Sequence, residues 1–117
     1  MTDRHRIEVS ENGDVTVVNF VDRKILDEAN IHELGQELFA LVEKDNRQKL
    51  LLNFSAVEFL SSAALGKLIH LDKKMKTNNG TQKFSNIRPE IFEVFVITKL
   101  NRIFDIQDDE IDALAAF

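Results

Sequence analysis

The sequence predicts an α/β fold with a mixed, mainly parallel β-sheet, an antiparallel strand pair at its start, and helices packed on the sheet. Short β-branched segments alternate with longer segments of helical spacing, which is the pattern of strands joined by crossover helices. Residues 50–54 form a nearly continuous apolar run, typical of a strand buried on both faces. With 117 residues and 44% hydrophobic side chains, the chain can build one domain with its own core.

The first two elements are predicted to form a hairpin. Residues 7–10 alternate between apolar and polar side chains, and residues 11–14 (Glu-Asn-Gly-Asp) are typical of a turn. Residues 15–20 are rich in β-branched side chains and form the predicted partner strand. The sheet is therefore expected to begin with an antiparallel pair.

The next element is predicted to be a helix that begins after Asp27 and ends before Asp45-Asn46. A carboxylate at Asp27 can accept a hydrogen bond from a free N–H of the first turn, which makes it a plausible N-cap. Gly35 lies on the apolar face, where we expect it to allow close approach to the sheet. That face repeats at helical spacing through Ile31, Leu34, Leu38, Leu41 and Val42.

The second half of the chain repeats the strand-helix order. After the strand at 50–54, a helix is predicted from Ser61-Ser62-Ala63-Ala64 to Asn79-Gly80. A strand at 83–87 follows, and Pro89 suits the first turn of a third helix because proline lacks an N–H that would be unpaired there. A last strand at 102–106 and a helix running from 108–110 to Phe117 complete the prediction. The apolar faces of the second and third helices comprise Ala64, Leu68, Leu71 and Met75, and Ile91, Phe92 and Phe95.

Composition excludes several classes of protein. The chain has no cysteine, so it carries no disulfide scaffold, thiolate metal site or cysteine nucleophile. The net charge of −5 argues against direct binding of nucleic acid or of an anionic membrane surface. The absence of a long apolar run argues against a membrane span, and residues 1–6 do not resemble a signal peptide. We therefore expect a soluble, cytoplasmic protein.

A search for catalytic residues finds no convincing set. The histidines His5, His32 and His70 fall on the terminus and on the polar sides of two helices, without the close spacing of a metal site. The four glycines are too scattered for a phosphate-binding loop. No nucleophile–base pair is evident, and we predict no catalytic residue, no metal site and no cofactor.

Two adjacent serines, Ser61 and Ser62, mark the transition from a buried strand and its loop to a helix. Each could cap the helix by accepting a hydrogen bond from an early N–H. Alternatively, one of them is a phosphorylation site, because a phosphate would be stabilised by the helix start while adding about two negative charges to a surface that contacts a partner. Local sequence does not choose between the two interpretations.

In the segment around these two serines, the sequence resembles the STAS domain, and specifically the bacterial anti-sigma factor antagonists. In that family an apolar strand ending in Asp or Asn leads through a loop to Asp-Ser-Ser-Gly-Leu-Gly at a helix start. The corresponding residues here are Asn53 and residues 59–66 (Phe-Leu-Ser-Ser-Ala-Ala-Leu-Gly). Further similarity lies in Leu26-Asp27 before the first helix, in residues 84–89, and in Ile103-Phe104. The resemblance implies that residues 1–117 form a single STAS domain.

The sequence departs from the family at the phosphorylation motif. An ungapped match places the family's Asp at Ser61, its first Ser at Ser62, and its second Ser, the usual phosphoacceptor, at Ala63. The following Gly becomes Ala64. Three outcomes stay open: phosphorylation of Ser62, phosphorylation of Ser61, or binding without any phosphorylation.

The resemblance also implies a function. Such proteins bind an anti-sigma factor, a serine kinase of the histidine-kinase-like ATPase fold, and thereby release the sigma factor for transcription. Phosphorylation by that kinase dissociates the complex, and a metal-dependent serine phosphatase restores binding; the antagonist itself is not an enzyme. The alternative is an unphosphorylated STAS scaffold or sensor that acts by self-association or within a signalling assembly. Partner-binding residues under the first interpretation are Asp27, Ser61, Ser62, Ala63, Ala64, Gly66 and an exposed Ile69.

Overall fold

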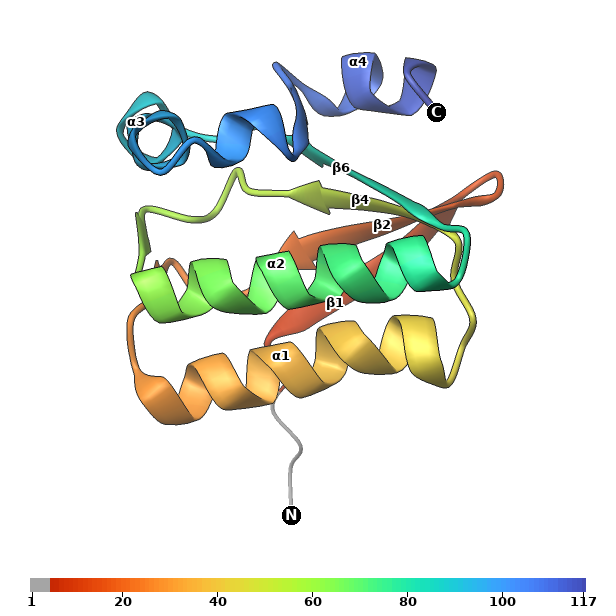
Figure 1. The fold of residues 1–117 in the computed structure, drawn as a ribbon, viewed down its shortest axis with the longest axis horizontal. Helices are drawn as coiled ribbons and strands as arrows, with labels where there is room; N and C mark the ends of the chain where they lie inside the picture. Colours follow the sequence, from red (N-terminus) through yellow and green to blue (C-terminus); the bar gives the residue numbers. More distant parts are fainter. Residues whose placement is uncertain (1–4) are drawn as a thin grey trace.

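The computed structural model describes residues 5–117 and contains a five-stranded sheet with helices on both faces (Figure 1). The strand order is β1-β2-β4-β6-β7, in which only β1 and β2 are antiparallel. The predicted mixed, mainly parallel sheet with an antiparallel first pair is therefore confirmed. The strands are β1 (Ile7–Asn12), β2 (Val15–Phe20), β4 (Lys49–Asn53), β6 (Thr81–Ser85) and β7 (Asp105–Gln107).

The helices divide unevenly between the two faces. α1 (Glu28–Glu43) and α2 (Ser62–Thr77) lie side by side on one face, which we call the front (Figure 1). α3 (Pro89–Ile97) and a 3₁₀ turn, η1 (Leu100–Arg102), follow β6. The short α4 (Glu110–Ala115) lies on the opposite face, the back, where it contacts β4, β6 and β7.

The first turn is tighter than the sequence predicts. β1 continues to Asn12, which pairs with Val15, so Gly13 and Asp14 alone form the connection. Gly13 has a φ of 62°, a conformation that glycine adopts without steric cost. A two-residue loop with glycine first is favoured between antiparallel strands because its twist matches theirs.

The alternating side chains of the strands build two cores of different size. In β4, Leu50 and Leu52 point to the front and Leu51 to the back, which confirms the prediction of a strand buried on both faces. The front core includes the buried faces of α1 and α2 and the rings of Phe54, Phe84 and Phe95. The back core contains Val15, Val17, Leu51 and Ala113, with Leu114 and Phe117 packed against it.

The predicted last strand, residues 102–106, is wrong in its position. Lys99 adopts a left-handed conformation with a φ of 63° after α3, and the chain then makes the turn η1 before β7 begins at Asp105. The apolar pattern at 103–106 arises because Phe104 is buried in the front core before the strand starts. β4 and β6 also begin and end slightly earlier than predicted.

A second, two-stranded sheet is absent from the sequence prediction. β3 (Lys24–Ile25) pairs in parallel with β5 (Phe59–Leu60). Two-residue strands are too short to show the alternation that identifies a strand in a sequence. This small sheet lies immediately before both front helices and determines how they start.

Candidate functional site

The pairing of β3 with β5 brings the starts of α1 and α2 together. Ile25 pairs with Leu60, and the Ser61 N–H donates to the Ile25 carbonyl at 3.0 Å. Asp27 and Ser61, which are 34 positions apart in the sequence, therefore both follow paired strands. The front helices begin side by side, and this shared end is the candidate functional site.

Asp27 is an N-cap, as predicted, and Ser61 rather than Ser62 caps α2, a choice that the sequence left open. The Asp27 carboxylate accepts a hydrogen bond from the Asn30 N–H at 3.1 Å, and the Ser61 hydroxyl accepts one from the Ala64 N–H at 3.2 Å. Both cap residues have the extended backbone that precedes a helix. Ser61 is thus occupied by capping, while the neighbouring Ser62 is free of that role.

The two helix starts differ in charge. α1 begins with the carboxylates of Asp27 and Glu28, whereas the first turn of α2 has no acidic side chain. Because a helix start carries a partial positive charge, carboxylates there are favourable, and α2 lacks that compensation. A negative charge added at Ser62 would meet a helix end that has no anion of its own.

The other predicted partner-binding residues differ in exposure. Ser62, Ala63 and Gly66 are exposed, and a methyl group added at Gly66 would touch nothing within 4 Å. Ala64 is only 1% exposed and packs in the front core. Ile69, expected to be exposed, is half-buried and also packs against that core, which corrects the prediction. Ile69 is half-buried because it lies next to Leu68, on the side of α2 that packs in the front core.

Two exposed apolar side chains beside the helix starts were missed in the sequence. Leu26 immediately precedes the α1 cap and is 53% exposed, and Phe59 in β5 is 50% exposed. The Lys24 ammonium lies 5.5 Å from the centre of the Phe59 ring. Large apolar side chains grouped on a surface are typical of protein-binding sites. Both residues belong to segments that resemble the family, Leu26 before Asp27 and Phe59 at the start of residues 59–66, but only the β3–β5 pairing relates the two segments.

An ion pair holds the loops that lead into the small sheet. Arg23 and Glu58 approach to 2.7 Å, and the Glu58 and Phe59 N–H groups both donate to the Arg23 carbonyl. The hydrogen bond from the Arg23 guanidinium lowers the pKa of Glu58 below its ordinary value. The pair ties the two entry segments to one another just before the helices begin.

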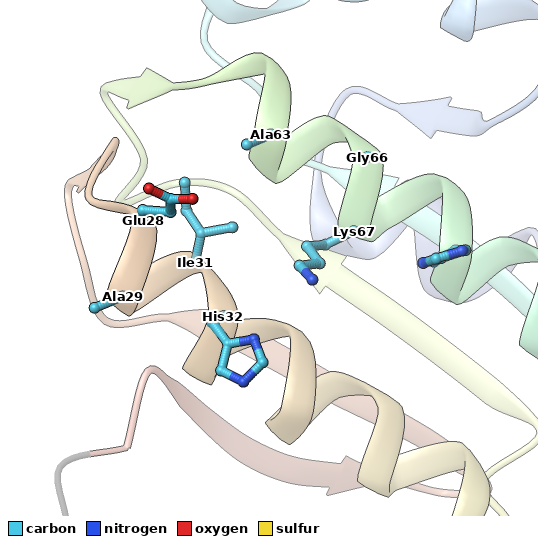
Figure 2. Close-up of a pocket in the computed structure, with 8 residues that line it drawn as sticks. Glu28, Ala29, Ile31, His32, Ala63, Gly66 and Lys67 are labelled. Carbon is cyan, nitrogen blue, oxygen red and sulfur yellow. The ribbon is translucent and has the colours of Figure 1, made fainter.

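A groove of about 840 Å³ runs between α1 and α2, starting at Ala63 (Figure 2). Glu28 and His32 border it from α1, and Lys67 reaches toward α1 from α2 (Figure 2). His70 also lines the groove. Sequence analysis placed these histidines on separate helices, and only the packing of α1 against α2 brings them to one groove.

Gly35 of α1 lies against the side chain of Lys67 of α2. Sequence analysis placed it against the sheet, but it faces α2, where an added Cβ would lie 2.9 Å from the Lys67 Cδ. The aliphatic part of Lys67 therefore occupies the space that Gly35 leaves. This contact holds the lysine along the groove.

Within residues 5–117, no group of three or more histidine, cysteine or acidic side chains is arranged to hold a metal ion. No helix in the same range has the length and apolarity needed to cross a bilayer. What distinguishes this end of the molecule is an exposed apolar and hydroxyl-bearing surface.

The sequence profile of the STAS domain matches residues 6–113. The chain belongs to the STAS domain family. This STAS domain is similar to BtrV of Bordetella bronchiseptica, which is named as an anti-sigma factor antagonist, with 29% identity over 93 residues, 80% of this chain and 79% of BtrV.

Solved structures of similar proteins confirm the predicted STAS-type fold. An anti-sigma-factor antagonist (STAS) domain protein from Planctomyces limnophilus has a TM-score of 0.84 at 23% identity, with 97% of this chain and 98% of that chain covered. The phosphorylated form of the Bacillus cell fate determinant SpoIIAA has a TM-score of 0.72 at 15% identity, covering 94% and 97%. Ala63, which the ungapped motif match pairs with the usual phosphoacceptor of the family, lines the groove.

Proposed function

We propose that this STAS domain, acting as one unit over residues 1–117, is an anti-sigma factor antagonist. It binds an anti-sigma factor of the serine-kinase type through the shared start of α1 and α2 and so releases a sigma factor. The observation that carries the proposal is that two exposed apolar side chains, Leu26 and Phe59, and the exposed hydroxyl of Ser62 all lie in the segments that lead into the paired helix starts. Such a surface is suited to binding a protein, and the domain needs no catalytic residues for this role.

Ser62 is the proposed phosphorylation site. Its neighbour Ser61 uses its hydroxyl to cap α2, and Ala63 has no hydroxyl, so Ser62 is the exposed hydroxyl at the helix start that no capping bond engages. A phosphate there gains from the uncompensated N-terminus of α2. It would also add about two negative charges at the paired helix starts, where α1 already carries the carboxylates of Asp27 and Glu28, and this opposes docking of an apolar partner surface. A serine phosphatase would reverse the change.

The test is to incubate the protein with purified candidate anti-sigma kinases and ATP, and to locate added phosphate by mass spectrometry. Ser62→Ala should abolish the modification, while Ser10→Ala, at an exposed serine in β1, should leave it unchanged. Binding is measured in parallel by calorimetry. Ser62→Asp should weaken the complex by about tenfold or more, and Ser62→Asn, of similar size without charge, should weaken it far less.

The two parts of the proposal fail separately. If a kinase binds tightly and Leu26→Asp disrupts binding, but no serine gains phosphate, the antagonist role stands and the switch is absent. If a kinase binds equally well to Leu26→Asp, the proposed binding surface is wrong, and if no candidate kinase binds, the antagonist role is wrong. The scaffold function would then gain support from the exposed apolar residues of α3, Phe92, Val96 and Ile97.

A further inference from the structure

The groove between α1 and α2 holds one lysine, Lys67, and one glutamate, Glu28. Lys67 makes no ion pair among residues 5–117, and exposed His32 and His70 also line the groove. Glu28 at the mouth is its single acidic side chain. The lining between these groups is apolar and small: Ala29, Ile31, Ala63 and Gly66. A carboxylate beside a compact apolar group would match Lys67 and this small apolar lining.

α4 of the same chain presents that combination. Ile111 is 78% exposed, and the exposed carboxylates of Asp108 and Asp112 flank it in the sequence. Neither Asp108 nor Asp112 takes part in an ion pair within the described part of the chain. The other two acids of this segment are engaged, because Asp109 caps Asp112 and Glu110 accepts a hydrogen bond from Asn53 at 2.9 Å.

The groove and α4 lie on opposite sides of the sheet, so one copy cannot bring them together. α1 and α2 cover the front core, whereas α4 packs on Val15, Val17 and Leu51 of the back (Figure 1). Contact between the two surfaces must therefore be intermolecular. Because the surfaces differ, the contact is heterologous, and repetition of it gives an open chain or a closed ring.

We propose that α4 of one copy docks into the α1–α2 groove of a second copy. Ile111 lies over the small side chains Ala63 and Gly66, and the Asp112 carboxylate pairs with the Lys67 ammonium. The groove volume of about 840 Å³ is ample for one branched aliphatic side chain and its flanking carboxylates. Since the groove starts at Ala63, a docked copy also covers part of the surface that the proposed function assigns to the anti-sigma factor, and the two ligands compete.

The experiment measures the mass of the pure protein by sedimentation and light scattering from about 10 μM to about 1 mM, the range of a weak contact. The average mass should rise with concentration and fall as salt is added, because exposed ion pairs are screened. Lys67→Glu and Asp112→Lys should each weaken association about tenfold or more, and the double variant should recover most of the loss. Circular dichroism and thermal unfolding verify that each variant is folded.

Matched controls identify the surface. Lys73→Glu reverses an exposed charge on the same helix outside the groove, and Ile97→Asp alters an isoleucine as exposed as Ile111, at 78%, but on α3. Both should associate like the original protein, whereas Ile111→Asp should not. A protein that stays monomeric throughout, a double variant that recovers nothing, or a Lys73→Glu variant as weak as Lys67→Glu overturns the proposal. None of these measurements involves the anti-sigma factor, so the proposed function is tested independently.

Discussion

The front and back of the sheet differ in what they bury. On the front, aromatic rings form a continuous cluster in which the Phe84 centroid lies 5.2 Å from that of Phe54, 5.9 Å from Phe95 and 4.6 Å from Phe104. On the back, the apolar core is small and polar pairs adjoin it. Lys83 pairs with Asp105, and Asn53 donates to Glu110.

The contrast is visible within one strand. Phe84 of β6 points to the front, while its neighbours Lys83 and Ser85 point to the back, although all three are buried. The front aromatic cluster holds the layer that contains α1 and α2, and hence the paired helix starts. Within residues 5–117, the back is covered by the six-residue helix α4 and by Phe117, which follows it. We conclude that the front core supplies most of the stability on which the site depends. Substitutions on the back should therefore lower the free energy of unfolding less.

The strongest test of this difference is Phe84→Ala. Removing a fully buried ring from the centre of the front cluster should lower the free energy of unfolding by about 3–5 kcal/mol, through lost burial and the cavity left behind. Urea unfolding at pH 7 measures the change through the transition midpoint and slope. Phe92→Ala, at a 38% exposed ring on α3, is the control and should cost less than about 1 kcal/mol. Equal losses in the two variants would show that the front cluster is not the main source of stability.

A smaller effect is expected on the back from Asp105→Asn. Lys83 has a side chain only 9% exposed, and its ammonium also lies 5.2 Å from the centre of the Phe117 ring. Loss of its carboxylate partner should cost about 1–2 kcal/mol, below the 3–5 kcal/mol of a fully buried pair because the Asp105 side chain is 41% exposed to solvent.

The pH dependence of the free energy of unfolding shows whether the loss in Asp105→Asn comes from the ion pair or from altered packing. The hydrogen bond from Lys83 holds the pKa of Asp105 below its ordinary value of 3.8. A carboxyl group with a lowered folded-state pKa stabilises the protein above that ordinary value and loses the contribution as pH falls through the folded-state pKa. The gap in unfolding free energy between the original protein and Asp105→Asn should therefore be constant from about pH 5 to 7, and should close as the pH falls below about 4 through the folded-state pKa of Asp105.

Asp14→Asn is the matched control for that measurement. The Asp14 carboxylate also accepts a hydrogen bond from a lysine, Lys49, at 2.7 Å, and its pKa is likewise lowered, but it is 74% exposed at the first turn. Solvent screens such a pair, so the substitution should leave the unfolding midpoint unchanged. A gap for Asp105→Asn that persists at low pH would mean that the ion pair is not its cause.

Sequence reasoning located the parts of the fold where the pattern is long and repeated. The helical spacing from Ile31 to Val42 and the apolar run of β4 gave the front helix and the central strand correctly. The cap of α1, Asp27, was also predicted, because capping depends on local chemistry, whereas the choice between Ser61 and Ser62 as the cap of α2 was left open.

The arrangement of the site could be predicted only in part. The β3–β5 pairing depends on two segments of two residues each, separated by α1 and β4, and neither has a pattern of its own. Leu26 and Phe59 are exposed because that small sheet lies at the edge of the fold, which no local sequence feature indicates. The groove was also missed, because His32 and Lys67 line one groove only once α1 has packed on α2.

The smallest predicted loss of stability comes from removing the N-cap of α2. It tests whether the start of α2 is held in place by that cap or by the front core. Ser61→Ala removes the hydroxyl that accepts the Ala64 N–H, and should lower the free energy of unfolding by about 1 kcal/mol, as is typical for an N-cap. Ser62→Ala removes an exposed hydroxyl with no capping bond and should be neutral within about 0.5 kcal/mol.

Amide hydrogen exchange then shows where the Ser61→Ala loss is felt. Because Ala64, Leu65 and Leu68 anchor α2 in the front core, the added exchange should be confined to the first turn of the helix, leaving the remainder protected. Such a local response would mean that the front core positions the site and the cap only completes it. Faster exchange along the whole of α2 would contradict this view, because it would make the serine cap, rather than the aromatic front, the element on which the site depends.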